Sequence, residues 1–182
     1  MHSKANYKPS KIKQLANQFT DSYFDYKTTY VPIIDIARRL GFEVYNTHLE
    51  DIFESFMIVE PYEQSVLGFN SNKIIGVNIN LSEAQKRCAV ARQLAQYLMA
   101  PTDKSFNHKS KMRKLHKGRC AEDDLAIEIL MPKPLVSTLY VTLKATYRHS
   151  GISIAELVEL VARGLNVPID YVMRRLVELS LI

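Results

Sequence analysis

The fold is decided by residues 77–99, VNINLSEAQKRCAVARQLAQYLM, where a short apolar strand leads through a polar turn into a long helix. Ser82 is a favourable N-cap, and Glu83 in the first turn suits the positive end of the helix dipole. Pro101 cannot continue a helix and therefore ends it. Small and apolar residues recur at helical spacing along one stripe, namely Ala84, Cys88, Ala91, Ala95 and Leu98. The pattern predicts a helix over Glu83–Met99 that packs closely against a neighbour.

The residues before this helix predict two further helices and a small sheet. Apolar residues at helical spacing indicate a helix over Lys11–Phe24, and Pro32 and Gly41 bracket a short helix over Ile33–Leu40. Apolar or alternating runs bounded by turn residues predict three or four short strands, at Phe42–Tyr45, Phe56–Glu60, Ser65–Phe69 and Lys73–Ile79.

The residues after it predict helices. One covers Glu122–Met131 and ends at Pro132, and another covers Leu135–Tyr147. The last 30 residues are predicted to form two apolar-faced helices around a turn at Gly164–Pro168, an arrangement that resembles a helix-turn-helix or the first part of a winged helix. The expected fold class is therefore α+β, mostly helical, with a small sheet and a C-terminal helix-turn-helix-like unit.

Composition indicates an ordinary soluble globular protein, because 47% of the 182 residues are hydrophobic and 24% are charged. Two distant cysteines do not make a disulfide framework, and no apolar run approaches the roughly 20 residues that span a bilayer. Residues 1–10 contain no apolar signal core. We expect a cytoplasmic protein without a membrane partner, and not a secreted, fibrous or disordered chain.

The net charge of +5 comes from one segment of the chain. Residues 100–119 hold seven cations and one anion, so this segment carries +6 and the other 162 residues sum to −1. Such a segment is either a solvated loop or a surface that contacts a polyanion or a partner. The candidate contact residues are Lys109, Lys111, Arg113, Lys114, Lys117 and Arg119.

The residues alone contain no established motif for nucleotide or metal chemistry. Six isolated glycines do not make a phosphate-binding loop, and the five histidines form no close pair. His116 and Cys120 are four residues apart and could form a soft metal site with His108 and Cys88. Exposed loop histidines and a buried cysteine are the simpler explanation.

Residues 77–99 are similar to the core of the ImmA/IrrE family of metallopeptidases, in which a strand ending in asparagine precedes a helix with the zinc motif HExxH. The segment Asp123–Pro132, DDLAIEILMP, resembles the family's second signature, and Leu165–Leu181 resembles its ending. Order and spacing match over about residues 30–182. The resemblance implies a zincin-like scaffold at residues 1–132, with a helical unit at residues 133–182 packed on it.

The residue types that zinc chemistry needs are absent from the positions of this sequence that the resemblance matches to the zinc motif. The two histidines of HExxH correspond to Arg92 and Gln96, and the glutamate corresponds to Gln93. Neither a guanidinium nor an amide is a usual zinc ligand, and an amide cannot act as a general base. The third ligand would fall near Arg119 or Ala121, and Glu122 lies about 100° round a helix from Ala121. We expect no catalytic residue and no zinc, although the family would use zinc, and a dismantled site at Arg92, Gln93, Gln96 and Glu122.

Two interpretations of these positions stay open. Arg92, Gln93 and Gln96 are either the polar stripe of an amphipathic helix with no site behind it, or part of a former cleft that is kept as a binding surface. In the second case Arg92 could bind a carboxylate of Glu122, Asp123 or a partner.

The resemblance implies a regulator, since active members of the family act on repressors of mobile elements and stress responses. We expect a non-catalytic protein that binds a repressor or another protein through the former cleft. One alternative is a DNA-binding regulator that uses residues 104–119 and the C-terminal helices. Another is a metallopeptidase with a relocated metal site at His108, His116, Cys120 and a carboxylate. A homodimer could form through aromatic residues that partly belong to the core, Tyr23, Phe24, Tyr26 and Tyr30.

Overall fold

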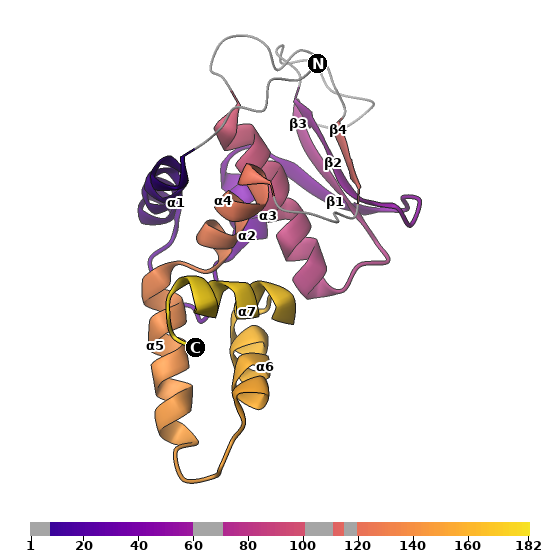
Figure 1. Ribbon diagram of the computed structural model, residues 1–182. Helices are drawn as coiled ribbons and strands as arrows, with labels where there is room; N and C mark the ends of the chain where they lie inside the picture. The colour runs from indigo at the N-terminus through magenta and orange to yellow at the C-terminus, as the bar shows by residue number, and fades with distance from the viewer. Residues whose placement is uncertain (1–7, 60–70, 101–110, 115–119) are drawn as a thin grey trace. The chain divides into compact units, whose positions relative to one another are not determined.

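The computed structural model describes residues 8–59, 71–100, 111–114 and 120–182, and it confirms the α+β fold class (Figure 1). The chain divides into two compact units. Residues 32–122 form one, called here the sheet unit, and residues 1–31 with 123–182 form the other, called the helical unit. A domain boundary at residue 132 stays a prediction; in the structure, residues 123–132 belong with the C-terminal helices.

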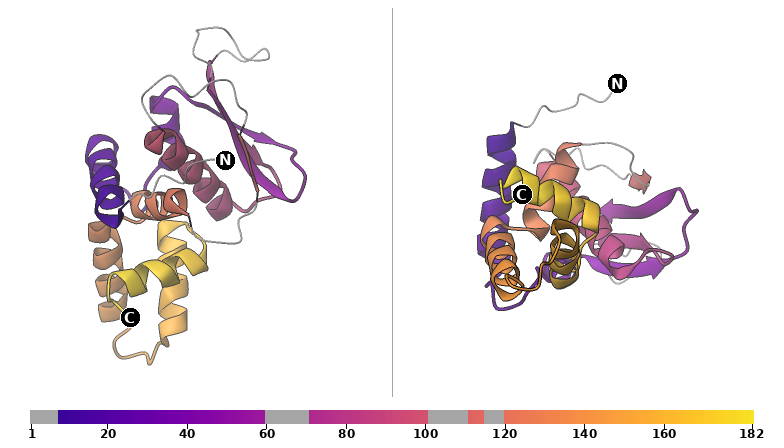
Figure 2. Two further views of the ribbon diagram at one scale, coloured as in Figure 1. Left: turned by 45° about the horizontal axis from the view of Figure 1, so that its top comes forward. Right: turned by 60° about the horizontal axis from the view of Figure 1, so that its bottom comes forward.

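The sheet unit has strand order β1-β3-β2-β4. Strand β1 runs parallel to β3, and β2 runs antiparallel to both of its neighbours. Helix α3 lies across one face of this sheet (Figures 1 and 2). The elements are α2 (Ile33–Arg39), β1 (Glu43–Thr47), β2 (Phe53–Val59), β3 (Lys73–Asn78), α3 (Glu83–Met99) and β4 (Lys111–Lys114).

Most of this unit agrees with the sequence pattern, and β4 does not. The predicted strand Ser65–Phe69 lies outside the described residues. The sequence pattern predicts no strand in the basic segment, but its residues 111–114 form β4 and pair with β2. Its pairing partner, which the local sequence does not reveal, makes this stretch a strand.

Helix α3 begins and ends where its sequence predicts. The Ser82 hydroxyl accepts from the Gln85 N–H, and the Gln85 side chain accepts from the Ser82 N–H at 2.9 Å, which completes a capping box. The expected stripe is buried at Cys88, Ala91 and Ala95. Burial extends all round the helix from Arg87 to Ala95, so α3 is a core helix rather than a surface helix with a wet face.

Two residues of β3 determine how the strand contacts β2 and the turn before α3. At Gly76 the Phe56 ring fills the space of a side chain, since a Cβ there would lie 2.2 Å from a ring carbon. The buried amide of Asn78 donates to the Phe53 carbonyl at 2.9 Å and accepts from the Asn80 N–H at 3.1 Å. Asn78 thereby ties the start of β2 to the turn before α3.

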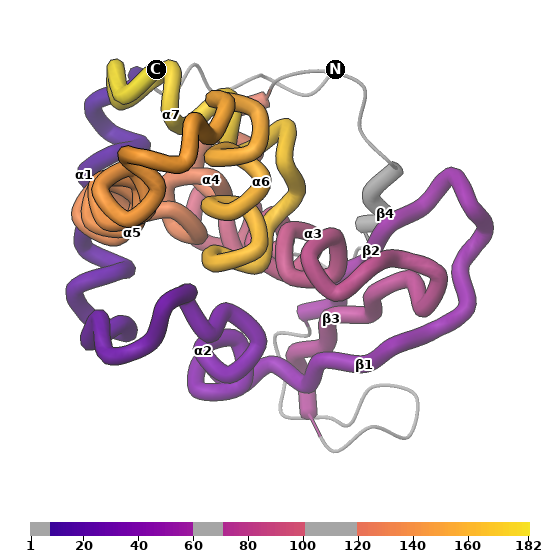
Figure 3. Tube along the Cα trace, turned by 90° about the horizontal axis from the view of Figure 1, so that it is seen from below, coloured from indigo at the N-terminus to yellow at the C-terminus, as the bar shows by residue number. Residues whose placement is uncertain are grey.

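The helical unit contains α1 (Pro9–Tyr23), most of α4 (Ala121–Leu130), α5 (Lys133–Thr146), α6 (Ile154–Leu165) and α7 (Ile169–Glu178). Helices α5 and α6 stand side by side (Figure 3). Gly164 allows this approach, because a Cβ there would lie 2.9 Å from Leu139. Asn166, with φ of 51°, ends α6 in the left-handed conformation and starts the predicted turn into α7.

Two further expectations concern the surface of the chain. Within the described residues, no single helix has both the length and the apolar composition of a membrane span. Helices α4 and α5 meet these criteria only when taken together, and the pair is bent by 57°. Of the four aromatic residues near α1, Phe24 is core at 6% exposure, whereas Tyr26 and Tyr30 are exposed.

Candidate functional site

The three positions that the resemblance predicts to correspond to the zinc motif lie in the middle of α3 and are largely removed from solvent. Arg92 is 8% exposed, Gln93 is fully buried, and Gln96 is half-buried. A guanidinium or an amide removed from water needs hydrogen-bond partners. Arg92 and Gln93 are therefore not part of a solvent-facing polar stripe.

Arg92 pairs with an acid on the neighbouring strand. Its Nη1 donates to Oε2 of Glu54 on β2, and the Glu54 side chain is 2% exposed. A buried cation and a buried anion neutralise each other only in close contact. Glu54 was not predicted as the partner. The signal in the sequence was an acid within the apolar run FESFMIV, residues 53–59, since a buried acid in a strand requires a partner.

Gln93 is tied to the adjacent residue of the same strand. Its Nε2 donates to Oγ of Ser55 at 2.8 Å, with both side chains buried. Its Oε1 is buried and has no hydrogen-bond partner among the residues that the structure describes. The Gln93 amide therefore holds α3 to β2 as a neutral hydrogen-bonding group.

A β-bulge explains how two consecutive strand residues meet the same helix. Glu54 and Ser55 would point to opposite faces of a regular strand. The register between β2 and β4 shifts between Phe53 and Ser55, with Phe53 opposite Lys114 and Ser55 opposite Arg113. Two residues of β2 thus oppose one of β4, which turns a side chain to the other face. The bulge brings both Glu54 and Ser55 to α3.

The residues at these positions do not fit zinc. A guanidinium paired with Glu54 presents N–H donors and a positive charge where the family would offer an imidazole nitrogen. The Gln93 amide directs an N–H group at Ser55. Within the described part of the chain, no three His, Cys, Asp or Glu side chains cluster as a metal site. His108 and His116, which the relocated site would use, lie outside the described residues.

The other predicted contact residues are placed only in part. Glu122 lies half-buried in the first turn of α4. Lys111, Arg113 and Lys114 belong to β4, at the edge of the sheet next to β2. Lys109, Lys117 and Arg119 lie outside the described residues.

Both cations of α7 are engaged within the helical unit. Arg174 donates to Asp124 and, at 3.2 Å, to Glu178. Arg175 is 2% exposed and donates to Glu128 and, at 3.0 Å, to the Met131 carbonyl. The exposed residues of α7 are apolar or acidic, namely Ile169, Asp170, Met173, Val177 and Glu178. Such a face lacks the cations that contact nucleic-acid phosphates.

Comparison with models of protein families identifies a match over most of the chain. The family model described as IrrE N-terminal-like domain, Peptidase_M78, matches residues 52–176, which is more than half of the chain. No curated protein matches the chain. The matched range contains β2 with Glu54 and Ser55, the whole of α3, and α4 to most of α7.

Proposed function

Because this chain belongs to the IrrE N-terminal-like family, Peptidase_M78, we propose that it is a non-catalytic member that binds a protein partner without cleaving it. The observation that carries the proposal is the buried pair of Arg92 and Glu54, with Gln93 bonded to Ser55 beside it. A zinc peptidase needs neutral nitrogen ligands and a carboxylate base at these positions. Here the same positions supply internal bonds that fasten α3 to β2.

The partner that we propose is a protein of the repressor class, bound at the surface that would be the substrate cleft of an active relative. The half-buried side chain of Gln96 is the member of the former motif that solvent still reaches. The positive segment 100–119, which follows α3 in the chain, favours an acidic protein segment as the ligand. The DNA-binding alternative draws no support from α7, because both of its cations bind acids of the helical unit.

Cleavage and binding can be tested separately. The purified chain, with and without added zinc, is incubated with casein and with a quenched-fluorescent peptide library. We expect no cleavage that a chelator abolishes. Zinc-dependent, chelator-sensitive turnover would contradict the non-catalytic assignment whatever the partner is.

Binding is tested in the cells of origin with a photo-crosslinking amino acid at Gln96. The matched control carries it at Glu83, an exposed residue about 20 Å away along the same helix. We expect a discrete cross-linked protein of full length from position 96 and none from position 83. Cross-linked fragments of a cut partner, or equal products from both positions, would overturn the proposal.

A further inference from the structure

Among the residues that the structure describes, strand β1 pairs on one side only and has backbone groups without a partner at its outer edge. Its one neighbour is β3, with Thr47 in register with Asn78. The Ile79 N–H donates to the Thr47 carbonyl at 2.9 Å, so Thr47 faces β3. The backbone groups of alternate residues in a strand point to the same neighbouring strand. Because Thr47 points to β3, the N–H and C=O groups of Val44 and Asn46 point away from the sheet. No described residue bonds to these groups.

The two edges of this sheet differ in protection against pairing with another strand. Natural edge strands are protected by lysines, prolines or bulges. By sequence β4 is KMRK, with three cations in four residues, and its partner β2 is bulged beside it. Strand β1 is EVYNT, with no cation, no proline and two β-branched residues. Of the two edges that the structure describes, the β1 edge therefore has no lysine, proline or bulge of its own to prevent pairing.

We infer that β1 pairs antiparallel with β1 of a second copy of this chain, which joins two sheets into one across a two-fold axis. The register follows from the unpaired groups. Placing Val44 opposite Asn46 of the second copy lets both residues exchange their N–H and C=O groups. Tyr45 then meets Tyr45 of the second copy at the axis, and Glu43 lies opposite Thr47.

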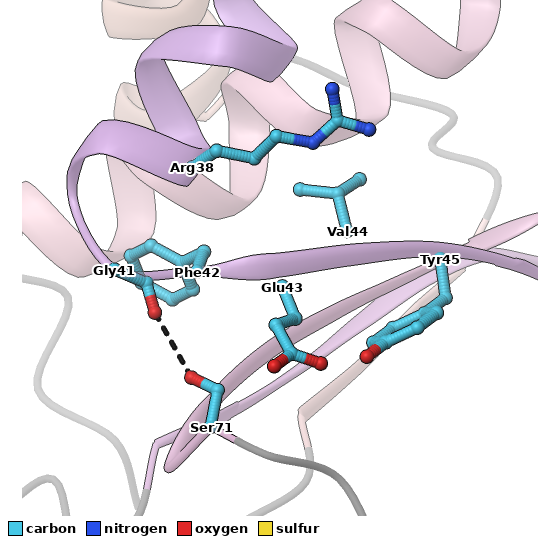
Figure 4. Close-up of a pocket in the computed structure, with 7 residues that line it drawn as sticks. All are labelled: Arg38, Gly41, Phe42, Glu43, Val44, Tyr45 and Ser71. Atoms are coloured by element: carbon cyan, nitrogen blue, oxygen red, sulfur yellow. Dashed lines mark hydrogen bonds between the residues drawn. The ribbon is translucent and has the colours of Figure 1, made fainter.

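The charge of β1 agrees with this register. Glu43 is the only charged residue of the strand, and no like charge faces it. An open hollow of about 440 Å³ lies along β1, lined by Arg38, Ser71 and residues 41–45 (Figure 4). In Figure 4 Arg38 extends over Val44, while Glu43 and Tyr45 point to the other side of the strand.

The pairing predicts a weak dimer. Five residues of edge strand bury less than the roughly 1,200 Å² that stable interfaces need. Tyr45 adds contact area at the axis, because its side chain is 36% exposed in the single copy. Association of two copies is therefore expected to increase with the concentration of the chain. It does not require the partner protein proposed above.

Sedimentation velocity of the full chain from about 5 to about 500 µM tests this pairing. The wild type is expected to shift from monomer to dimer across the range. Asn46→Pro removes an outward N–H, which an edge strand tolerates, and is expected to abolish the shift. Asn46→Ala keeps that N–H and is the matched control, expected to dimerise like the wild type.

A second pair of variants keeps the test decisive if proline disturbs folding. Tyr45→Lys places like charges at the axis and is expected to stay monomeric, whereas Tyr45→Phe is expected to dimerise. Circular dichroism confirms that each variant is folded. A wild type that stays monomeric at the highest concentration, or folded Asn46→Pro and Tyr45→Lys variants that dimerise normally, would overturn the inference.

Discussion

Arg92 supplies a fixed positive charge at a position that the sequence resemblance predicts to correspond to a zinc ligand of active relatives. Its partner Glu54 comes from β2, through the bulge that also brings Ser55 to α3. A buried ion pair contributes little compared with well-packed apolar residues, but breaking it leaves an uncompensated charge. The pair therefore constrains which residues position 92 can hold.

A double-mutant cycle on this pair tests the coupling. Arg92→Ala leaves Glu54 buried without its cation and is expected to cost about 3–5 kcal/mol in the free energy of unfolding. Arg92→Ala with Glu54→Ala is expected to cost less than the sum of the two single variants. Urea denaturation at neutral pH measures all three variants. Additive losses would show that the two residues are not coupled.

The contact between Gly76 of β3 and the Phe56 ring of β2 offers a second test at the residue scale. Gly76→Ala places a Cβ within the Phe56 ring and is expected to destabilise the chain by about 1–3 kcal/mol. Combined with Phe56→Leu, which removes the ring, the loss is expected to be smaller than the sum of the single variants. Thermal unfolding measures both, and a neutral Gly76→Ala variant would contradict the packing.

The sequence predicted part of the site and missed the rest for a physical reason. Arg92, Gln93 and Gln96 were found because a resemblance fixed their positions on one helix. Glu54 was missed because its contact with Arg92 joins residues 38 positions apart. The bulge at Glu54 also depends on β4, whose residues carry no alternating apolar pattern.

At the scale of elements, the helices that carry their own capping signals were predicted best. The bounds of α3 match those predicted from Ser82 and Pro101. The β4 strand was missed because strands form through partners rather than local signals. Local signals thus positioned the helices, and pairing across the sheet positioned β4.

The capping box of α6 predicts a pH-dependent effect. Hydrogen bonds from the Ser153 backbone and hydroxyl lower the pKa of Glu156 below its ordinary value. A carboxylate with a lowered pKa stabilises the folded state above the pKa of the unfolded chain, and this stability is lost as the pH falls through the folded pKa.

Glu156→Gln is therefore expected to reduce stability at pH 7, with the difference from wild type shrinking below about pH 4.5. Urea denaturation across this range measures it. Glu159→Gln is the control, since Glu159 is exposed on the same helix but caps nothing. A difference that does not change with pH would mean that the Glu156 charge is not involved.

At the scale of the whole molecule, three separated stretches of sequence predicted the family. They did not predict how the elements group into two units. The signature helices were recognised by order and spacing, which a single chain displays. The grouping of α1 with α4–α7 joins the two ends of the chain, which no local pattern shows. The charge excess stays a property of one segment, residues 100–119, on an otherwise nearly neutral chain.

Zinc binding by the purified wild-type chain tests the central claim most directly. Metal-free protein is titrated with zinc by calorimetry at neutral pH, and its metal content after dialysis is measured by mass spectrometry. Because Arg92 and Gln93 are held by Glu54 and Ser55, we expect far less than one zinc per chain. A His116→Ala/Cys120→Ser variant identifies any zinc held at a relocated site. One tightly bound zinc per chain in the wild type, with chelator-sensitive cleavage of a protein, would contradict the account.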